Sequence, residues 1–418
     1  MTGCSLKGFM KMKVLVINAG SSSVKYYLYE MPQAEVVANG AVERVGEAVS
    51  KLTHCRDHQA HETPILALDV DDAMNLMFDT LVRSDIGVLR DLSEIGAVGH
   101  RVVHGGEEFT GSVVVDEQVV ASIERYADLA PLHNPPNLAG IRAAEHRLPG
   151  VSQVACFDTA FHTTIPKVAY MYALPYDLYE KYHIRRYGFH GISHRYVARR
   201  AAAILGRGKY EINAITCHLG NGCSITAVKN GHSIDTSMGF TPLEGVPMGT
   251  RSGDLDPAIL FYLVDKGYSA QSLKMLCNKD SGLLGISGLS NDIRNLLDLA
   301  GQGNERAALA IDVFCYRIRK YIGAYAAVLE PLDAIVFTGG IGENAVSLRE
   351  HVCRNMTQLG VHFDARVNER AGGQETEISA AGSPVKVFVI PTNEQLAIAK
   401  DTYDLTTRRQ VVASDGAA

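Results

Sequence analysis

The sequence predicts an α/β protein made of two similar domains. Two segments carry this prediction, VLVINAGSSSVKYYLY at 14–29 and AITCHLGNGCSITAVK at 214–229. Each reads as a strand, a glycine turn and a returning strand, and each is followed by an Asn-Gly turn, at Asn39-Gly40 and Asn230-Gly231. A repeated supersecondary unit indicates a duplicated domain. We therefore expect two domains that each direct a glycine turn into a shared cleft.

The composition excludes several classes of protein. The chain has 418 residues, 46% of them hydrophobic, which is enough for about two or three domains with sizeable cores. The net charge is −6 and no basic stripe is present, which argues against a nucleic-acid partner. The eight scattered cysteines favour a reducing, cytoplasmic compartment over a disulfide framework or a zinc ribbon. No apolar run reaches the roughly 20 residues of a membrane span, and no signal peptide is recognisable.

The first glycine turn has two interpretations. Val14–Ile17 is a short β-branched run typical of a buried strand, and Val24–Tyr29 reads as its partner. Between them, Asn18–Ser23 combines Gly20 with three serines, and convergent N–H groups in such a turn can bind an anion. A plain hairpin with solvated serines explains this stretch equally well.

A third strand is predicted at Glu35–Val45 and an amphipathic helix at Asp71–Asp91. Between them, His54, His58 and His61 stand at helical spacing. No apolar frame would hold three metal ligands there, so we interpret the segment as a solvated loop.

Two further strands end in charged residues. Ile95–Val103 places Arg101 at the carboxyl end of a strand, where open α/β sheets bind ligands. Val151–Phe157 is followed directly by Asp158, which suits either a Mg²⁺ site or a helix N-cap.

The Pro-rich stretch LAPLHNPPN at 129–137 is predicted to be a loop that fixes His133. This histidine is either a functional group or a satisfied loop residue. Asn137 is the expected cap of a helix over 138–146.

The second half of the chain holds a further set of polar loops. In RRYGFHGISH at 185–194, His190 and His194 have zinc-like spacing, but no third ligand or intervening Glu is present. A phosphoryl or substrate contact by His190 is therefore favoured. The long loop 239–256 lacks periodicity and carries Arg251 between flexible pairs, which indicates a functional loop.

Three features follow towards the C-terminus. Ser290–Asp292 are cap candidates for a helix, and Glu305–Leu329 is a long amphipathic helix. Ala334–Asn344 is a strand that ends in glycines, which suits close approach to a nucleotide but is a weak signal alone. Val385–Ile390 predicts the last strand, and Glu394 precedes a helix near any anion bound at its N-terminus.

Together these motifs resemble the acetokinase family, within the superfamily of acetate and sugar kinases, Hsp70 and actin. The motifs span Asn18 to Glu394 in the family's order, and the whole set is far more specific than any single motif. They are NAGSSSVK, GHRVVHGG, LAPLHNPPN, FDTAFH, RRYGFHGISHRY, HLGNGCS, DTSMGFTPLEGVPMGTRSGD, SGLLGISGLSNDIR, FTGGIGEN and PTNE.

The resemblance implies a role for each matching residue. The implied catalytic residues are Asp158, His190, Arg251 and His133; the substrate-binding residues are Arg101, Val103, Leu132, Phe189 and Pro242; and the metal ligands are Asn18 and Glu394. The implied nucleotide-binding residues are Lys25, His218, Leu219, Gly220, Asn221, Gly222, Asp292, Ile293, Arg294, Gly339, Gly340, Ile341, Gly342, Glu343 and Asn344. Ile192 and Gln395 depart from the family's usual Thr and Glu, and neither is assigned to chemistry.

The resemblance also implies the fold and the reaction. The expected fold is two duplicated actin-like, ribonuclease H-like domains around a nucleotide cleft. The expected reaction is Mg²⁺-dependent transfer of the ATP γ-phosphoryl group to acetate, with Mn²⁺ able to substitute and a homodimer as the expected assembly. A propionate kinase of the same family is the alternative, and an ATPase switch without a carboxylate substrate is a more distant one.

Acetate is ionised at neutral pH, since its pKa is close to the roughly 4 of a side-chain carboxyl, and so it needs no general base. We expect Asp158 to orient Arg101 or a metal-bound water instead. Because Val103 leaves less room than Ala, we expect acetate to be preferred, propionate accepted and butyrate poor.

We expect the first domain to comprise 12–158 and 385–405, on the acetate and metal side and completed by the C-terminal helix. The second, nucleotide-binding domain is expected over 159–384. Met12-Lys13 directly precedes the first strand, so 1–11 is predicted to be a disordered extension, as is 406–418.

Overall fold

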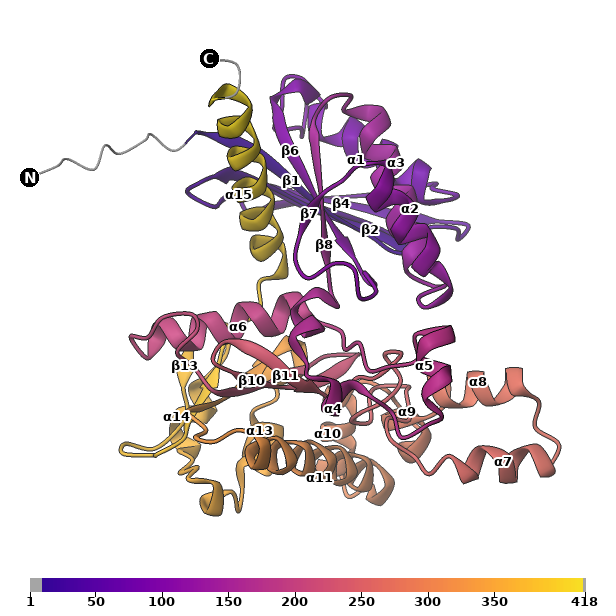
Figure 1. Cartoon of the computed structure of the whole chain (residues 1–418), viewed down its shortest axis with the longest axis vertical. Coiled ribbons are helices and arrows are strands. Elements are labelled where there is room, and N and C mark those ends of the chain that lie inside the picture. Colours follow the sequence, from indigo (N-terminus) through magenta and orange to yellow (C-terminus); the bar gives the residue numbers. More distant parts are fainter. Residues whose placement is uncertain (1–9, 416–418) are drawn as a thin grey trace, which may run out of the picture. The chain divides into compact units, whose positions relative to one another are not determined.

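Two units make up the part of the chain that the computed structural model describes, residues 10–415 (Figure 1). One unit consists of the chain up to Ala160 together with the chain from Asn393 onward, and the other is Phe161–Thr392. Within residues 10–415, no helix combines the length and the apolar character needed to cross a membrane.

The first unit is built on an eight-stranded sheet with the order β5-β4-β3-β2-β1-β6-β8-β7. β1 pairs antiparallel with β2 and parallel with β6, and β6 pairs parallel with β8. The carboxyl ends of β1, β6 and β8 therefore share one end of the sheet. The strands are β1 (Met12–Ala19), β2 (Ser23–Met31), β3 (Glu35–Glu43), β4 (Ser50–Arg56), β5 (Gln59–Ile65), β6 (Ile95–Val102), β7 (Val113–Val114) and β8 (Ser152–Phe157).

The sheet of the second unit has the order β11-β10-β9-β12-β14-β13. β9, β12 and β14 are parallel, β10 and β11 form an antiparallel meander on one side, and β13 is antiparallel on the other. In order and direction this matches β3-β2-β1-β6-β8-β7, so the predicted duplication is confirmed. The strands are β9 (Ala214–Leu219), β10 (Cys223–Lys229), β11 (His232–Thr236), β12 (Ala334–Thr338), β13 (Thr376–Glu377) and β14 (Lys386–Val389).

Helices cover both faces of the first sheet (Figure 1). On one face, α1 (Val70–Val82) and α3 (Asn134–Arg147) bury Met74, Phe78 and Ala144 against strand residues such as Leu15. On the other face, α15 (Glu394–Asp415) packs closely on β6, where a Cβ at Gly99 would come within 2.3 Å of Thr402 Oγ1. The remaining helices are α2 (Glu117–Arg125) and the 3-10 helices η1 (Leu92–Glu94), η2 (Tyr126–Asp128) and, at the boundary between the units, η3 (Ala160–Thr164).

In the second unit, α6 (Gly191–Ile204) and α11 (Glu305–Val328) lie on opposite faces of the sheet (Figure 1). Val197 and Ala201 of α6 pack against Val336 and Phe388 of the strands. The other helices are α4 (Lys167–Tyr170), α5 (Tyr176–Tyr182), α7 (Ala258–Asp265), α8 (Ala270–Lys279), α9 (Gly282–Ser287), α10 (Ile293–Gly301), α12 (Gly339–Asn344), α13 (Val346–Cys353), η4 (Thr357–Leu359) and α14 (Ala365–Arg370).

The segment around His54 is a β-hairpin, and the predicted solvated loop is wrong. β4 and β5 form this hairpin, and the fully buried His54 ring lies 2.6 Å from Tyr26 Oη through Nδ1 and 3.0 Å from Ile86 O through Nε2. Burial lowers the pKa of this histidine. Both ring nitrogens have protein partners, and residues 10–415 contain no cluster of three His, Cys, Asp or Glu that could hold a metal.

Asn39-Gly40 is also not a turn, because both residues lie inside β3. The chain turns earlier, at Pro32–Ala34, where Ala34 takes a left-handed φ of 62°. Gly40 is needed in the strand for another reason: a Cβ there would come within 2.3 Å of Thr53 O.

The C-terminal segment differs from the prediction in two places. β14 belongs to the second sheet, because Lys386 pairs in parallel register with Ala334, and the first unit resumes only at Asn393. α15 continues through Asp415 and buries Thr406, so most of the tail predicted to be disordered is helical.

At the N-terminus, residues 1–9 of the predicted extension lie outside the described residues, as do 416–418 at the other end. Met10 O accepts a hydrogen bond of 2.9 Å from Tyr403 Oη, and Lys11 lies 3.6 Å from Glu30. The described end of the extension therefore contacts the fold.

Candidate active site

A buried ion pair joins the ends of β6 and β8. Arg101 Nε donates to Asp158 Oδ1 at 3.1 Å, and its Nη2 donates to Oδ2 at 2.6 Å. The Asp158 side chain is only 2% exposed and that of Arg101 is 20% exposed. Burial lowers the pKa of Arg101, but the carboxylates of Asp158 and Glu394 outweigh burial and raise this pKa. The guanidinium is thus held charged and in a fixed orientation, with its Nη1 edge turned away from the Asp158 contact.

Glu394 and Asn18 complete the polar groups at this end of the first sheet. Glu394 opens α15, and its Oε2 lies 3.9 Å from Arg101 Nε. The half-buried Asn18 lies near the end of β1, opposite the exposed Lys25 of β2. Amide and carboxylate oxygens are donors that Mg²⁺ accepts, and two protein ligands leave positions for water and phosphate oxygens. The residue types therefore fit the predicted metal.

The sequence analysis missed the site role of Asn137, which was expected only to cap a helix. α3 begins at Asn134, so Asn137 lies inside it and is buried. Its Oδ1 accepts from Val103 N at 3.0 Å and its Nδ2 donates to Ala19 O at 2.6 Å. One side chain thus joins the last residue of β1 to the residue that follows β6, and these two strands carry Asn18 and Arg101.

Asn134 acts on the same loop, and was also missed. Its Oδ1 accepts from His104 N at 3.1 Å and its Nδ2 donates to His104 O at 3.0 Å. An asparagine on each side of the Pro-Pro pair was the signal in the sequence. His133 directly precedes α3, so its backbone is fixed by the start of this helix.

The two apolar residues predicted to bind substrate in this unit differ in exposure. Val103 is 8% exposed, whereas Leu132 is 63% exposed. In the second unit, Phe189 is buried and Pro242 is half-buried.

Both glycine turns close as hairpins. Gly20 N donates to Ser23 O at 2.8 Å, and Gly220 N donates to Gly222 O at 3.1 Å. The N–H of the first glycine is therefore used within each turn, which favours the hairpin interpretation for the serine turn. Cys223 Sγ adds a further bond, to Gly220 O, in the second turn.

Gly222 lies beside His190 and Arg251, the two residues predicted to contact the transferring phosphoryl group in the second unit. A Cβ at Gly222 would lie 3.3 Å from His190 Cε1, 3.5 Å from His190 Nε2 and 3.4 Å from Arg251 Nη1. The turn, the histidine and the arginine are thus gathered at one place. A side chain at this position would crowd the space between the histidine and the arginine.

Arg251 differs from Arg101 in what surrounds it. Its Nη1 donates to Pro242 O at 3.1 Å, and among the ion pairs of the described residues none involves Arg251. Burial lowers its pKa, which is the expected effect on a cation without a carboxylate partner. A partly buried guanidinium in this setting favours the arrival of an anion.

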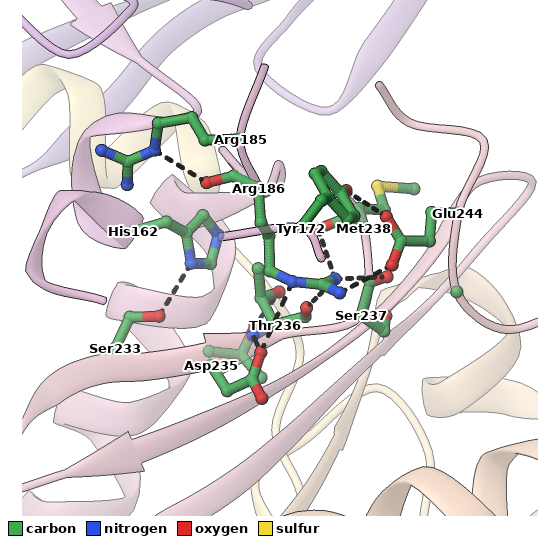
Figure 2. Close-up of polar contacts among 12 residues, drawn as sticks. His162, Tyr172, Arg185, Arg186, Ser233, Asp235, Thr236, Ser237, Met238 and Glu244 are labelled. Atoms are coloured by element: carbon green, nitrogen blue, oxygen red, sulfur yellow. Dashed lines mark hydrogen bonds and ion pairs between the residues drawn. The ribbon is translucent and has the colours of Figure 1, made fainter. Parts of the chain in front are cut away.

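Arg186 fixes the loop that contains Pro242 and Arg251 (Figure 2). Its guanidinium donates to Glu244 Oε1 at 2.6 Å and to Thr236 O at 2.7 Å. Tyr172 Oη donates to the other oxygen of Glu244 and accepts from Phe240 N at 2.9 Å. The sequence analysis missed this clamp, because its members come from four separate segments.

The His190–His194 pair is not a zinc pair. His194 Nδ1 lies 2.7 Å from Thr216 Oγ1, and its Nε2 lies 2.7 Å from Ser224 Oγ, so both nitrogens have protein partners. The ring of His190 stacks instead on that of His218, at a centroid distance of 4.2 Å.

The late glycine turn packs directly on the second hairpin. Gly339 has a φ of 76°, and a Cβ there would come within 2.7 Å of Leu219 O. Asn221 Oδ1 similarly approaches Gly249, where a Cβ would lie 2.5 Å from it. The predicted nucleotide-binding turns and the Arg251 loop therefore adjoin one another within the second unit.

Two predicted nucleotide-binding side chains are engaged within the protein. Glu343 Oε1 accepts from Gly339 N at 2.9 Å and from Thr392 N at 3.0 Å. Asp292 caps α10 by accepting from Arg294 N, as predicted, and also pairs with the Arg294 guanidinium at 2.6 Å. The Oε1 atom of Glu343 thus joins the late glycine turn to the segment that follows β14.

A sequence model described as the acetokinase family matches residues 13–400. The chain belongs to the acetokinase family. It is 55% identical over 398 residues to an acetate kinase of Heliobacterium modesticaldum, covering 94% of this chain and 99% of the relative. It is 54% identical over 400 residues to an acetate kinase of Thermotoga maritima, covering 95% and 99%.

Solved structures of acetokinase-family proteins have the same fold. Porphyromonas gingivalis acetate kinase matches with a TM-score of 0.91 and 48% identity, covering 94% of this chain and 99% of that one. A propionate kinase from Francisella tularensis matches with a TM-score of 0.88 and 42% identity, covering 94% and 100%. The predicted two-domain, actin-like α/β fold is confirmed.

Proposed function

We propose that this chain catalyses the reversible transfer of the γ-phosphoryl group of ATP to acetate, giving acetyl phosphate and ADP. The acetate kinase relatives that cover nearly the whole chain support the reaction. The observation that carries the substrate class is the buried Arg101–Asp158 pair at the ends of β6 and β8.

Arg101 binds the carboxylate of acetate. Asp158 uses its Nε and Nη2, which leaves the edge formed by Nη1 and the second Nη2 hydrogen for a bidentate contact that lysine could not copy. The acid needs no proton removed, so Asp158 acts by holding Arg101.

The transfer itself is direct and in line. A carboxylate oxygen of acetate forms a bond to the γ-phosphorus as the bond to the β–γ bridging oxygen breaks, and ADP leaves. The transition state is loose and carries its charge on three equatorial oxygens. Arg251 and His190 stabilise that charge, with His133 assisting, and a guanidinium in this role is worth about 10³–10⁵ in rate.

The second unit binds the nucleotide. Its turns 218–222 and 339–344, together with 292–294, contact ATP, and Lys25 contributes a charge to the phosphates. Asn18 and Glu394 hold Mg²⁺, for which Mn²⁺ substitutes, and the metal neutralises phosphate charge when bound.

Propionate kinase activity is the second candidate, since the Francisella propionate kinase has the same fold at 42% identity. Val103, Leu132, Phe189 and Pro242 set the size limit. Steady-state kinetics with two-, three- and four-carbon acids decides between the two, and comparable kcat/KM for acetate and butyrate would overturn the acetate assignment.

The chain forms a cytoplasmic homodimer in this proposal. α7 supports the dimer, because Ile259, Phe261, Tyr262 and Val264 are all exposed on it. None of the seven cysteines of the described residues forms a disulfide, which supports a reducing compartment. Light scattering of Phe261→Glu tests the dimer: a mass of one chain is expected for this variant, and an unchanged mass would rule out this face.

The decisive experiment measures acetyl phosphate formed from ATP, with and without acetate and with and without Mg²⁺. Product that requires both is expected. ATP hydrolysis that is independent of acetate, with no acetyl phosphate, would instead favour an ATPase switch.

A further inference from the structure

A chain of hydrogen bonds runs from His190 into the core of the second unit. Ser224 Oγ lies 2.9 Å from His190 Nδ1 and 2.7 Å from His194 Nε2. On its far side, His194 Nδ1 lies 2.7 Å from Thr216 Oγ1. Ser224, His194 and Thr216 are fully buried. The other nitrogen of His190, Nε2, lies at Gly222 beside Arg251.

The number of protons restricts this chain to two arrangements. The Ser224 hydroxyl has one hydrogen, so it donates to one of its two histidine neighbours and accepts from the other. If it donates to His190 Nδ1, then His194 donates from Nε2 and accepts from Thr216. If it donates to His194, then His190 donates from Nδ1 and His194 donates to Thr216.

The first arrangement fits only a neutral His190, whereas the second fits any His190 that carries a proton on Nδ1. In the first, His190 is neutral and its single proton is on Nε2. In the second, His190 carries a proton on Nδ1, and as an imidazolium it also carries one on Nε2. Rotation of two hydroxyls and a tautomer change at His194 convert one arrangement into the other without moving a ring.

We propose that Ser224 and His194 are positioning residues that keep a proton on Nε2 of His190, facing the transferring phosphoryl group, in both of its protonation states. The inference rests on the proposed function, in which His190 stabilises that group.

The surroundings of His194 allow it to switch tautomer rather than take up charge. Burial lowers its pKa well below the ordinary value, and His162 and His218 lower it further. The ionisable groups around His190 include His218, stacked at 4.2 Å, His194 through Ser224, and Arg251 across Gly222. The hydroxyl of Ser224, 2.9 Å from Nδ1, is the group that orients the ring from its buried side.

The test compares Ser224→Ala with Thr226→Val. Thr226 is a fair control because it is buried on the same strand two residues away, and its hydroxyl contacts Thr236 at 2.8 Å instead of a histidine. Loss of an orienting partner typically lowers activity about 10–100-fold. We expect Ser224→Ala to lower kcat by that factor, with the KM for ATP and for acetate within about threefold.

The dependence of kcat on pH distinguishes a role of Ser224 in positioning His190 from a role in packing alone. In the wild type and in Thr226→Val, kcat should stay level as His190 loses its proton. In Ser224→Ala, kcat should fall as the pH rises, because only the imidazolium then guarantees a proton on Nε2. Ser224→Thr keeps a hydroxyl, so its kcat should again be independent of pH over this range. His194→Gln should show the same fall in kcat with rising pH as Ser224→Ala.

A measurement on the wild type avoids any folding defect of the variants. With ¹⁵N-labelled histidine and His190→Gln to assign the signal, the neutral ring should show its proton on Nε2. A proton on Nδ1, or identical profiles for Ser224→Ala and Thr226→Val, would overturn the inference while acetyl phosphate still forms. A wild type that makes no acetyl phosphate would instead overturn the proposed function.

Discussion

At the scale of single residues, the two arginines that we propose to act in the reaction have different surroundings. Arg101 is held by a bidentate carboxylate and keeps one edge for another, whereas Arg251 is bound only through neutral partners such as Pro242 O. The Arg101 guanidinium is therefore fixed in orientation, whereas the charge of the Arg251 guanidinium is not balanced by a carboxylate among the residues that the structure describes. In the proposed reaction, the surroundings of Arg101 suit the binding of a carboxylate substrate and those of Arg251 suit a transferring phosphoryl group.

Asp158→Asn should reveal the orienting role. The amide keeps the shape but loses the charge that holds Arg101, so the KM for acetate should rise and kcat should fall about tenfold or more. The KM for ATP should change by less than about twofold. The control is Glu375→Gln, which alters an equally bidentate but more exposed pair with Arg200, at 2.6 and 2.8 Å. Unchanged acetate kinetics in Asp158→Asn would contradict the role.

Gly222→Ala should slow the proposed phosphoryl transfer, because it crowds His190 and Arg251. The added methyl group would lie 3.3 Å from His190, which must shift by a few tenths of an ångström, and 3.4 Å from Arg251, at the limit of ordinary contact. We expect kcat to fall about tenfold. The control is Gly323→Ala in α11, where a Cβ meets nothing within 4 Å and should raise stability by about 0.5–1 kcal/mol. Equal kcat in both variants would argue against crowding at the site.

At the scale of elements, the sequence predicted most strands and the long helix correctly because their apolar patterns are continuous. Its errors have physical causes that a local pattern does not contain. His54 is polar, but two long-range hydrogen bonds satisfy its ring nitrogens and allow it to be buried. Asn39-Gly40 lies inside a strand, where Gly40 is packed against Tyr26 and Thr53 of neighbouring strands. The Arg186–Glu244 clamp was equally invisible, since it joins segments far apart in the sequence.

The start of α3 is joined to the ends of two strands through the side chain of Asn137. Asn137→Ala would leave Val103 N and Ala19 O without their buried partner, at about 1–3 kcal/mol for each group. We expect the free energy of unfolding to fall by about 2–4 kcal/mol and the KM for acetate to rise. Urea unfolding and steady-state kinetics measure the two effects, with Asn278→Ala, whose amide bonds Lys274 O in α8, as the control. A stability loss no larger than that control would refute the bracing role.

At the scale of the whole molecule, each unit contains a buried histidine, which should make acid stability a property of both units. Burial lowers the pKa of His100, in β6, to about 4, and that of His162, in η3, to about 4. The unfolded value is 6.5. Above pH 6.5 both states are neutral, so stability is fully present there. As the pH falls towards 4, only the unfolded chain takes up these protons, and stability is lost.

Each of these histidines should therefore lower the free energy of unfolding by about 3 kcal/mol as the pH falls from 6.5 to 4, at about 1.4 kcal/mol per pH unit. Thermal unfolding at a series of pH values measures the loss. His100→Gln and His162→Gln should each flatten the curve over this range, because a neutral side chain takes up no proton when the chain unfolds. His58→Gln is the control, since it removes an exposed imidazole. Curves for the two buried variants that run parallel to the wild type would show that other groups dominate acid unfolding.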